Sequence, residues 1–187
     1  METEKFESVL CKFIGDFPVG NNMVRNADAL RRMHENNESS LFNKLMLVQA
    51  GSIVEASLDQ IFYRAKTHTK EGLPEIPDEE RKKIAEKEAE RFATIIDVMK
   101  GHKLLDGLGV GIYDELHKLR QYPNRIQIQL DDKPTGISRR ENEAFTKDIV
   151  EWSFNLCIRV LKHLTDRYPR PKDLEQYAHE IKLPNAL

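Results

Sequence analysis

A chain of 187 residues, 40% of them hydrophobic and 32% charged, has the size and balance of one globular domain. Its formal net charge of −2 excludes an overall attraction to nucleic acid, so any RNA contact would need a local basic patch. No apolar run approaches the ~20 residues that span a bilayer, and two cysteines are too few for a disulfide framework. We therefore expect no membrane partner and a cytoplasmic location.

Apolar residues near the N-terminus are spaced for helices. Residues 2–17 predict one face of a short helix, which Pro18 and Gly20 would end. The more polar residues 22–37 predict a second, peripheral helix. We interpret residues 1–38 as a helical N-terminal extension packed on a bundle formed by residues 39–187.

The strongest helical pattern covers residues 41–66, where apolar side chains recur at the spacing of a central core helix. Ser39 and Ser40 precede this segment as candidate N-caps. A loop is expected over residues 67–77. From Asp78 we predict a charged helix whose apolar second half ends near Gly101.

Helical spacing resumes at residues 112–121, and Pro123 interrupts it because proline lacks an N–H group. Residues 126–130 alternate apolar and polar side chains, a pattern that suits an extended segment as well as a helix. Residues 131–136 form a clear break.

The C-terminal part contains the last long helical pattern. Ser138 and Glu141 form a capping-box pattern that predicts a helix from there to about Tyr168. A short terminal helix is expected at residues 173–182. These segments together predict an all-α fold, a helical bundle built around the helices at 41–66 and 138–168.

Common catalytic and metal-binding motifs are absent from the sequence. It contains no His-Glu-x-x-His motif, no Gly-x-Ser-x-Gly motif and no P-loop, and its six histidines lie far apart. We therefore expect neither a metal site nor a cofactor. The glycine-rich run Gly107–Gly111 is interpreted as a connection between helices, residues 79–91 as a solvated helix face, and Trp152 as a core residue.

One segment carries a pattern with chemical meaning: Leu119-Arg120-Gln-Tyr-Pro-Asn124-Arg125-Ile-Gln127. It resembles the active-site segment of HEPN domains, in which an arginine is followed after four to six residues by a histidine, often with a polar residue between them. Arg120 matches the arginine, and Gln127 stands where the family has its histidine. The resemblance covers about residues 40–168, because residues 51–62 also resemble the first long helix of such domains.

The resemblance implies a small helical bundle that forms a homodimer, with a composite site made by the motifs of two protomers. HEPN domains often cleave RNA in defence and toxin–antitoxin systems, so the implied partners are RNA or a nucleotide, and an antitoxin or other protein. Arg120, Tyr122, Asn124 and Arg125 are the implied nucleic-acid-binding residues. Arg120, Gln127 and His117 are the candidate catalytic residues.

The missing histidine bears on activity. Metal-free RNA cleavage needs a base that takes the proton of the 2′-hydroxyl and a cation that stabilises the phosphorane. Arginine supplies the cation, but glutamine exchanges no proton near neutral pH. His117, one helical turn before Arg120, is either a substitute base or an ordinary polar helix residue.

Three hypotheses follow. The first is a HEPN-like protein that binds RNA or a nucleotide and has weakened or lost ribonuclease activity. The second is an active, metal-independent ribonuclease toxin that uses His117 or an unexpected base. The third is a dimeric protein-interaction module in which Arg120 forms a structural salt bridge to Glu115 or Asp114.

Overall fold

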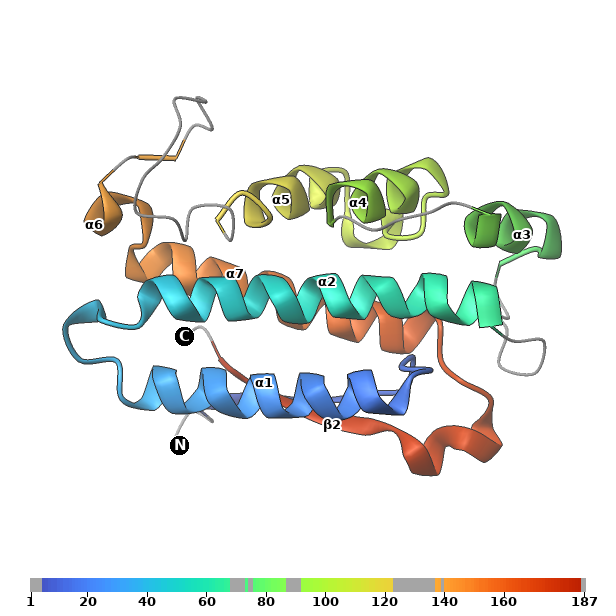
Figure 1. The fold of residues 1–187 in the computed structure, drawn as a ribbon, viewed down its shortest axis with the longest axis horizontal. Helices are drawn as coiled ribbons and strands as arrows, with labels where there is room; N and C mark the ends of the chain where they lie inside the picture. The colour runs from blue at the N-terminus through green and yellow to red at the C-terminus, as the bar shows by residue number, and fades with distance from the viewer. Residues whose placement is uncertain are drawn as a thin grey trace.

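Two long helices, α2 (Asn43–Thr67) and α7 (Lys147–Arg167), lie side by side through the centre of the protein (Figure 1). The structure, a computed structural model, describes residues 5–67, 73, 76–86, 92–122, 137–138 and 140–185. The two helices run in the same direction. At their starts, Asn43 donates to the carbonyl oxygen of Phe145, and near their ends, Arg64 donates to the carbonyl oxygen of Tyr168.

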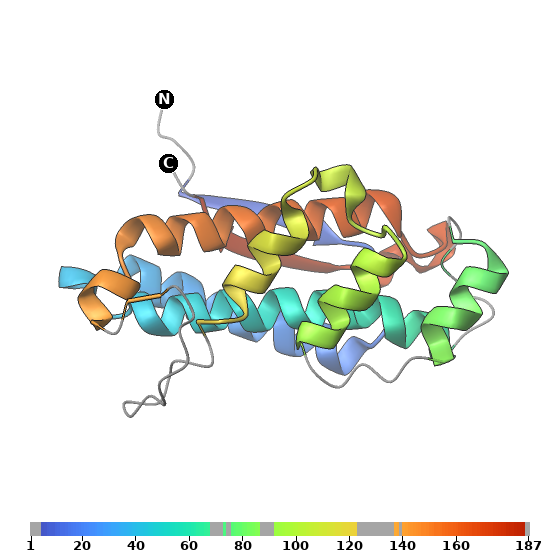
Figure 2. The same ribbon diagram turned by 90° about the horizontal axis from the view of Figure 1, so that it is seen from above.

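Two layers cover this central pair. On one side lie α1 (Phe17–Glu35) and a two-stranded sheet of β1 (Phe6–Cys11) and β2 (His179–Pro184). On the other side lie α4 (Phe92–Gly101) and α5 (Ile112–Leu119), which cross the central helices obliquely (Figure 2). The remaining elements of the described residues are α3 (Asp78–Glu86), α6 (Glu141–Ala144) and the short 3-10 helices η1 (Glu38–Ser40), η2 (Asp106–Leu108) and η4 (Lys172–Tyr177).

The prediction of a helix at residues 2–17 is wrong, and of the helix predicted at residues 173–182 only the first part is helical, as the 3-10 helix η4, before the chain enters β2. Residues 6–11 form β1, which pairs antiparallel with β2, so that Val9 lies opposite Ile181. Val9 and Cys11 are buried while Leu10 between them is exposed, which is the two-residue period of a strand. The fold is therefore mostly α-helical with a small sheet rather than all-α. The division at residue 38 stays an interpretation, but the sheet joins the N-terminal segment to residues 179–184.

Helix α1 begins earlier than predicted. Pro18 lies in its first turn, where proline is tolerated, and Oδ1 of Asp16 accepts a hydrogen bond from the backbone N–H of Val19 at 3.2 Å. Gly20 therefore belongs to the helix and does not end it. Its lack of a side chain has a local reason, since a Cβ there would lie 2.4 Å from the ring of His179 on β2.

The capping predictions are also wrong in detail. Ser39 and Ser40 have positive φ angles of 52° and 63° at η1 and do not cap α2. Ser138 precedes only the four-residue helix α6, of which Glu141 is the first residue. The long helix α7 begins at Lys147, because Oγ1 of Thr146 accepts the backbone N–H of Ile149 at 3.4 Å.

The other predicted helices are present wherever the structure describes their residues. The helix expected from Asp78 to Gly101 is represented by α3 and α4, and residues 87–91 between them lie outside the described residues. Helix α5 confirms the pattern at residues 112–121. The predicted interruption at Pro123, the alternating segment 126–130 and the break at 131–136 lie outside the described residues.

The core continues between all of these layers. Cys11 and Cys157 are buried in it as free thiols, and burial raises the pKa of Cys11 to about 12. Within the described ranges, none of the helices combines the length and apolar character required to traverse a bilayer.

Candidate functional site

Helix α5 presents a buried face and a polar face. Its buried face consists of Ile112, Tyr113, Leu116 and Leu119. The helical period places Asp114, His117 and Lys118 on the other side, which is exposed or partly exposed. Arg120 follows directly as the C-cap residue, and its backbone N–H donates to the carbonyl oxygen of Leu116 at 3.0 Å. The sequence therefore folds locally so that the candidate side chains point away from the core.

His117 and Arg120 are in direct contact. Nε of Arg120 donates a hydrogen bond to Nδ1 of His117 over 3.0 Å. Both side chains are partly exposed, and 25% of the His117 side chain is accessible to solvent. The structure thus brings together a guanidinium and an imidazole, the two groups that metal-free phosphodiester chemistry requires.

A third residue, Asp97 of α4, completes a chain of polar contacts. Its Oδ1 lies 3.2 Å from Nε2 of His117, on the opposite side of the ring from Arg120. Asp97 was not predicted from the sequence, because it lies on α4 whereas His117 lies on α5, so that no local spacing connects them. Its only signal in the sequence is an acidic position on the polar face of an otherwise apolar helix segment.

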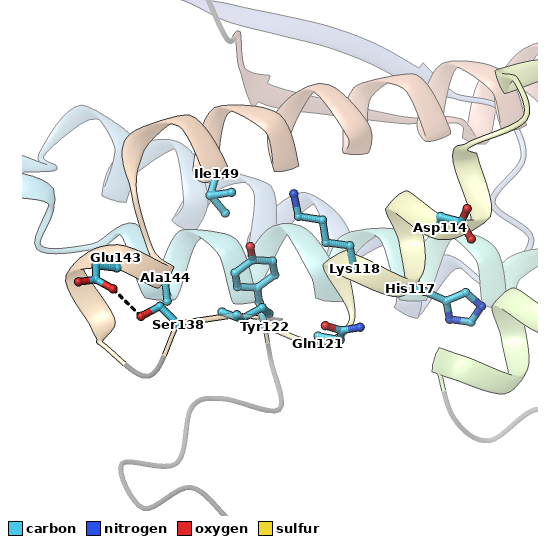
Figure 3. A pocket seen from close by; sticks show the side chains of 10 residues that line it. Asp114, His117, Lys118, Gln121, Tyr122, Ser138, Glu143, Ala144 and Ile149 are labelled. Carbon is cyan, nitrogen blue, oxygen red and sulfur yellow. Dashed lines mark hydrogen bonds between the residues drawn. The ribbon is translucent and has the colours of Figure 1, made fainter. Parts of the chain in front are cut away.

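An open pocket of about 510 Å³ begins beside this chain (Figure 3). Asp114 and His117 lie at one end, and Lys118 and Tyr122 extend from the α5 side toward α7. The far end contains Glu143 of α6, whose carboxylate accepts a hydrogen bond from Oγ of Ser138 at 2.7 Å. The lining also includes the apolar side chains of Ile137, Ala144 and Ile149.

The charges around the pocket are mixed. Asp114 and Glu143 are acidic, and Lys118 is basic. Glu143 is also paired with Arg140, whose Nη1 lies 3.0 Å from Oε1. Two carboxylates in the lining disfavour the burial of a polyphosphate there. Carboxylates, amides and hydroxyls instead suit the N–H groups on the edge of a nucleobase.

Tyr122 belongs to the wall of the pocket and is only 3% exposed. Its ring lies 6.0 Å from that of Phe145 and 6.4 Å from that of Trp152, between centroids. Trp152 is partly buried against the core, and the Lys118 ammonium lies 4.6 Å from its ring centroid. These aromatic contacts fix the wall and hold Lys118 at the pocket.

The salt bridge expected under the third hypothesis is not present among the described residues. Glu115 instead accepts from Nη1 of Arg159 at 3.0 Å and from Nε1 of Trp152 at 3.3 Å, which ties α5 to α7. Arg120 forms its contact with His117, and it pairs with neither Glu115 nor Asp114 within the described part of the chain.

The other candidate site residues lie outside the described residues: Asn124, Arg125 and Gln127. Their roles therefore stay predictions. In the part of the chain that the structure describes, no group of three or more histidine, cysteine, aspartate or glutamate side chains is arranged to hold a metal ion.

A second pocket, of about 470 Å³, lies at the start of α2 and α7. It is lined by Ser39, Leu41, Lys44, Phe145 and Lys147 among others, and Lys44 is paired with Glu141. None of the candidate residues of the sequence lies in it.

No protein-family model, curated protein or solved structure matches the chain. The resemblance to HEPN domains therefore depends on the residues quoted above and stays a prediction.

Proposed function

We propose that this protein is a HEPN-like RNA-associated protein that holds a phosphate of single-stranded RNA at Arg120 and His117. The observation that carries this proposal is the 3.0 Å hydrogen bond between these two side chains at the edge of an open pocket. Gln127 stands in place of the family's histidine, so the proposed protein has weakened ribonuclease activity. The proposal includes a homodimer, in which two copies bring their motifs together.

The charges favour RNA over a free nucleoside triphosphate. The guanidinium of Arg120 matches phosphate oxygens with a fork of donors. The two carboxylates of the neighbouring pocket oppose additional phosphates but accept N–H groups of a base. An RNA strand satisfies both conditions when its phosphate lies at Arg120 and an unpaired base enters the pocket.

Binding of a fluorescein-labelled single-stranded RNA of mixed sequence, followed by fluorescence anisotropy, tests the proposal. We expect Arg120→Ala to weaken binding roughly 10- to 100-fold, because a charge-assisted contact contributes about 1.5–3 kcal/mol. Arg25→Ala is the matched control, since it removes an exposed arginine of α1 with the same change in net charge.

Two results would contradict the proposal. The first is that the wild-type protein binds no RNA. The second is that Arg25→Ala and Arg120→Ala weaken binding equally, which would mean that only net charge matters. A dimer that binds no RNA would point instead to the protein-interaction module.

The contacts of His117 favour a second function, a slow metal-independent endoribonuclease. In this reaction the 2′-hydroxyl gives its proton to His117, and the 2′-oxygen forms a bond to phosphorus. The bond between phosphorus and the 5′-oxygen breaks, the 5′-oxygen takes a proton from water, and His117 returns its proton to the resulting hydroxide. The products are a 2′,3′-cyclic phosphate and a 5′-hydroxyl, and Arg120 stabilises the charge that develops on the phosphorane.

Product analysis in the presence of a metal chelator tests this second function. We expect slow release of 2′,3′-cyclic phosphate ends by the wild type and loss of this activity in His117→Gln. Expression of an active enzyme should also arrest growth, as a toxin would. Equal cleavage by the wild type and His117→Gln would exclude His117 as the base.

A further inference from the structure

We infer that Asp97 is a positioning residue for His117, and that Arg120 covers the imidazole nitrogen that would act as base until a phosphate draws the guanidinium away. This inference rests on the proposed function and adds the control of its site. It begins from the two contacts on opposite sides of one ring, 3.0 Å to Arg120 and 3.2 Å to Asp97.

The two contacts fix where the hydrogen of the imidazole is. Nε of Arg120 always carries a hydrogen, so Nδ1 of His117 accepts this hydrogen bond and has no hydrogen of its own. The ring hydrogen is therefore on Nε2, which faces the carboxylate of Asp97. A histidine without such partners exchanges between two tautomers, whereas this arrangement holds one.

The hydrogen bond from Arg120 also occupies Nδ1 of His117, the ring nitrogen that would act as the base. While Arg120 donates to Nδ1, a substrate hydroxyl cannot reach that lone pair. A proton added to Nδ1 would also face the N–H group of Arg120, so that two donors would point at each other. The site is therefore closed to proton transfer in the absence of a ligand.

A phosphate offers Arg120 a better partner than the imidazole does. A neutral ring nitrogen accepts one hydrogen bond from Nε, whereas a phosphate accepts two parallel, charge-assisted bonds from the guanidinium. The side chain is partly exposed and, among the described residues, it makes this one side-chain hydrogen bond, so little opposes its movement. The carboxylate of Asp97 lies 3.2 Å from the other ring nitrogen, so this movement leaves that contact unchanged.

When the guanidinium of Arg120 moves to the phosphate, Nδ1 of His117 becomes accessible from the pocket, which His117 itself lines. The 2′-hydroxyl next to the bound phosphate then gives its proton to Nδ1, and the resulting imidazolium is stabilised by Asp97. The cation that releases the base is the same one that stabilises the phosphorane. The site thus becomes competent only when a phosphodiester is present.

Nitrogen-15 NMR of the histidine rings in the full chain tests the positioning role without any RNA. The His117→Gln variant assigns the signals of His117, and spectra are recorded at about pH 8.5, where ordinary histidines are neutral. We expect His117 in a single tautomer with its hydrogen on Nε2. In the Arg120→Ala background, where the guanidinium no longer keeps the hydrogen off Nδ1, Asp97→Ala should convert this to a mixture of tautomers, and Asp97→Asn, which keeps an acceptor oxygen, should largely restore it.

Asp166→Ala is the matched control, because Asp166 is an exposed aspartate of α7 far along the chain from the site. Asp97 is itself 67% exposed in its side chain, so its replacement should not affect folding. A hydrogen on Nδ1 in the wild type, or a ring that does not respond to Asp97→Ala in the Arg120→Ala background, would overturn the positioning role.

The release step is tested with an RNA dinucleotide that has a 2′-deoxyribose before its phosphate and therefore cannot be cleaved. We expect its addition to change the Nδ1 signal of His117 while the hydrogen stays on Nε2. Binding without any change at Nδ1 contradicts the release step alone. Failure of both this dinucleotide and longer single-stranded RNA to bind contradicts the proposed function, while the tautomer result still decides the role of Asp97.

Discussion

Arg64 of α2 and Tyr168, the C-cap residue of α7, are joined by a hydrogen bond from Nη1 of the arginine to the tyrosine carbonyl oxygen. Arg64 is fully buried, and it also donates to the carbonyl oxygens of Phe13 at 3.3 Å and Pro169 at 3.2 Å. One guanidinium therefore ties together the segment after β1, the end of α2 and the end of α7. This arrangement satisfies carbonyl groups that the end of a helix leaves without intrahelical partners.

Replacing Arg64 should therefore strongly destabilise the fold. We expect Arg64→Ala to lower the free energy of unfolding by at least about 3 kcal/mol, because it leaves buried carbonyl groups unsatisfied and creates a cavity. Urea unfolding followed by circular dichroism measures this, with Arg25→Ala expected to change stability by less than about 0.5 kcal/mol. A similarly small effect of Arg64→Ala would mean that these contacts do not hold the two helix ends together.

The pairing of β1 with β2 leads to a second prediction. Ile181 is fully buried on β2 and Lys182 beside it is exposed, so substitutions at these two positions should have very different effects on stability. We expect Ile181→Ala to cost about 2–5 kcal/mol of unfolding free energy and Lys182→Ala less than about 0.5 kcal/mol. Thermal or urea unfolding distinguishes them, and equal effects would contradict a strand with alternating faces at this position.

Glu55 of α2 should make stability depend on pH. Burial, and second the nearby carboxylate of Asp59, raise the pKa of Glu55. The folded state then holds this proton more tightly than the unfolded state does, so stability falls as pH rises from the ordinary glutamate pKa through the raised one. At pH values above the raised pKa, the charged carboxylate of Glu55 lowers the free energy of unfolding by a constant amount.

Glu55→Gln should remove this cost and still accept the hydrogen bond from the backbone of Phe92. We expect the variant to be more stable than the wild type at pH 7, with the difference disappearing as pH falls below about 4, where Glu55 is protonated in both states. Urea unfolding at the two pH values measures this. A variant that is less stable at pH 7 would contradict the direction of the shift.

Placing a histidine at position 127, as in HEPN domains, gives a fourth prediction. If position 127 corresponds to the catalytic histidine of HEPN domains, Gln127→His should increase RNA cleavage by about 10²–10⁴-fold, the usual contribution of a general acid–base group. Release of 2′,3′-cyclic phosphate ends by the variant measures it, and Gln127→Asn serves as a control that adds no titratable group. An unchanged rate with intact RNA binding would count against the alignment of this motif.

Local patterns in the sequence were sufficient to predict the long helices and two members of the site. The core helix at 41–66 and the helix at 112–121 were found because their apolar periodicity extends over several turns. His117 and Arg120 lie three residues apart on one helix, so their proximity follows from helical geometry alone.

Features that depend on distant partners were not predictable in the same way. Residues 6–11 have the apolar spacing of a helix face, but their strand depends on hydrogen bonds to residues 179–184 at the other end of the chain. Asp97 reaches His117 only because α4 and α5 pack side by side, which no local pattern encodes. The start of α7 was misplaced because Thr146, and not Ser138, supplies the cap.

Backbone amide NMR of the wild-type protein during titration with single-stranded RNA tests the central claim most directly. We expect the largest shifts at residues 114–122 and expect Arg120→Ala to require a much higher RNA concentration to produce them. Shifts centred instead on the second pocket, at residues 39–45 and 141–147, or no shifts at all, would contradict an RNA site at Arg120 and His117.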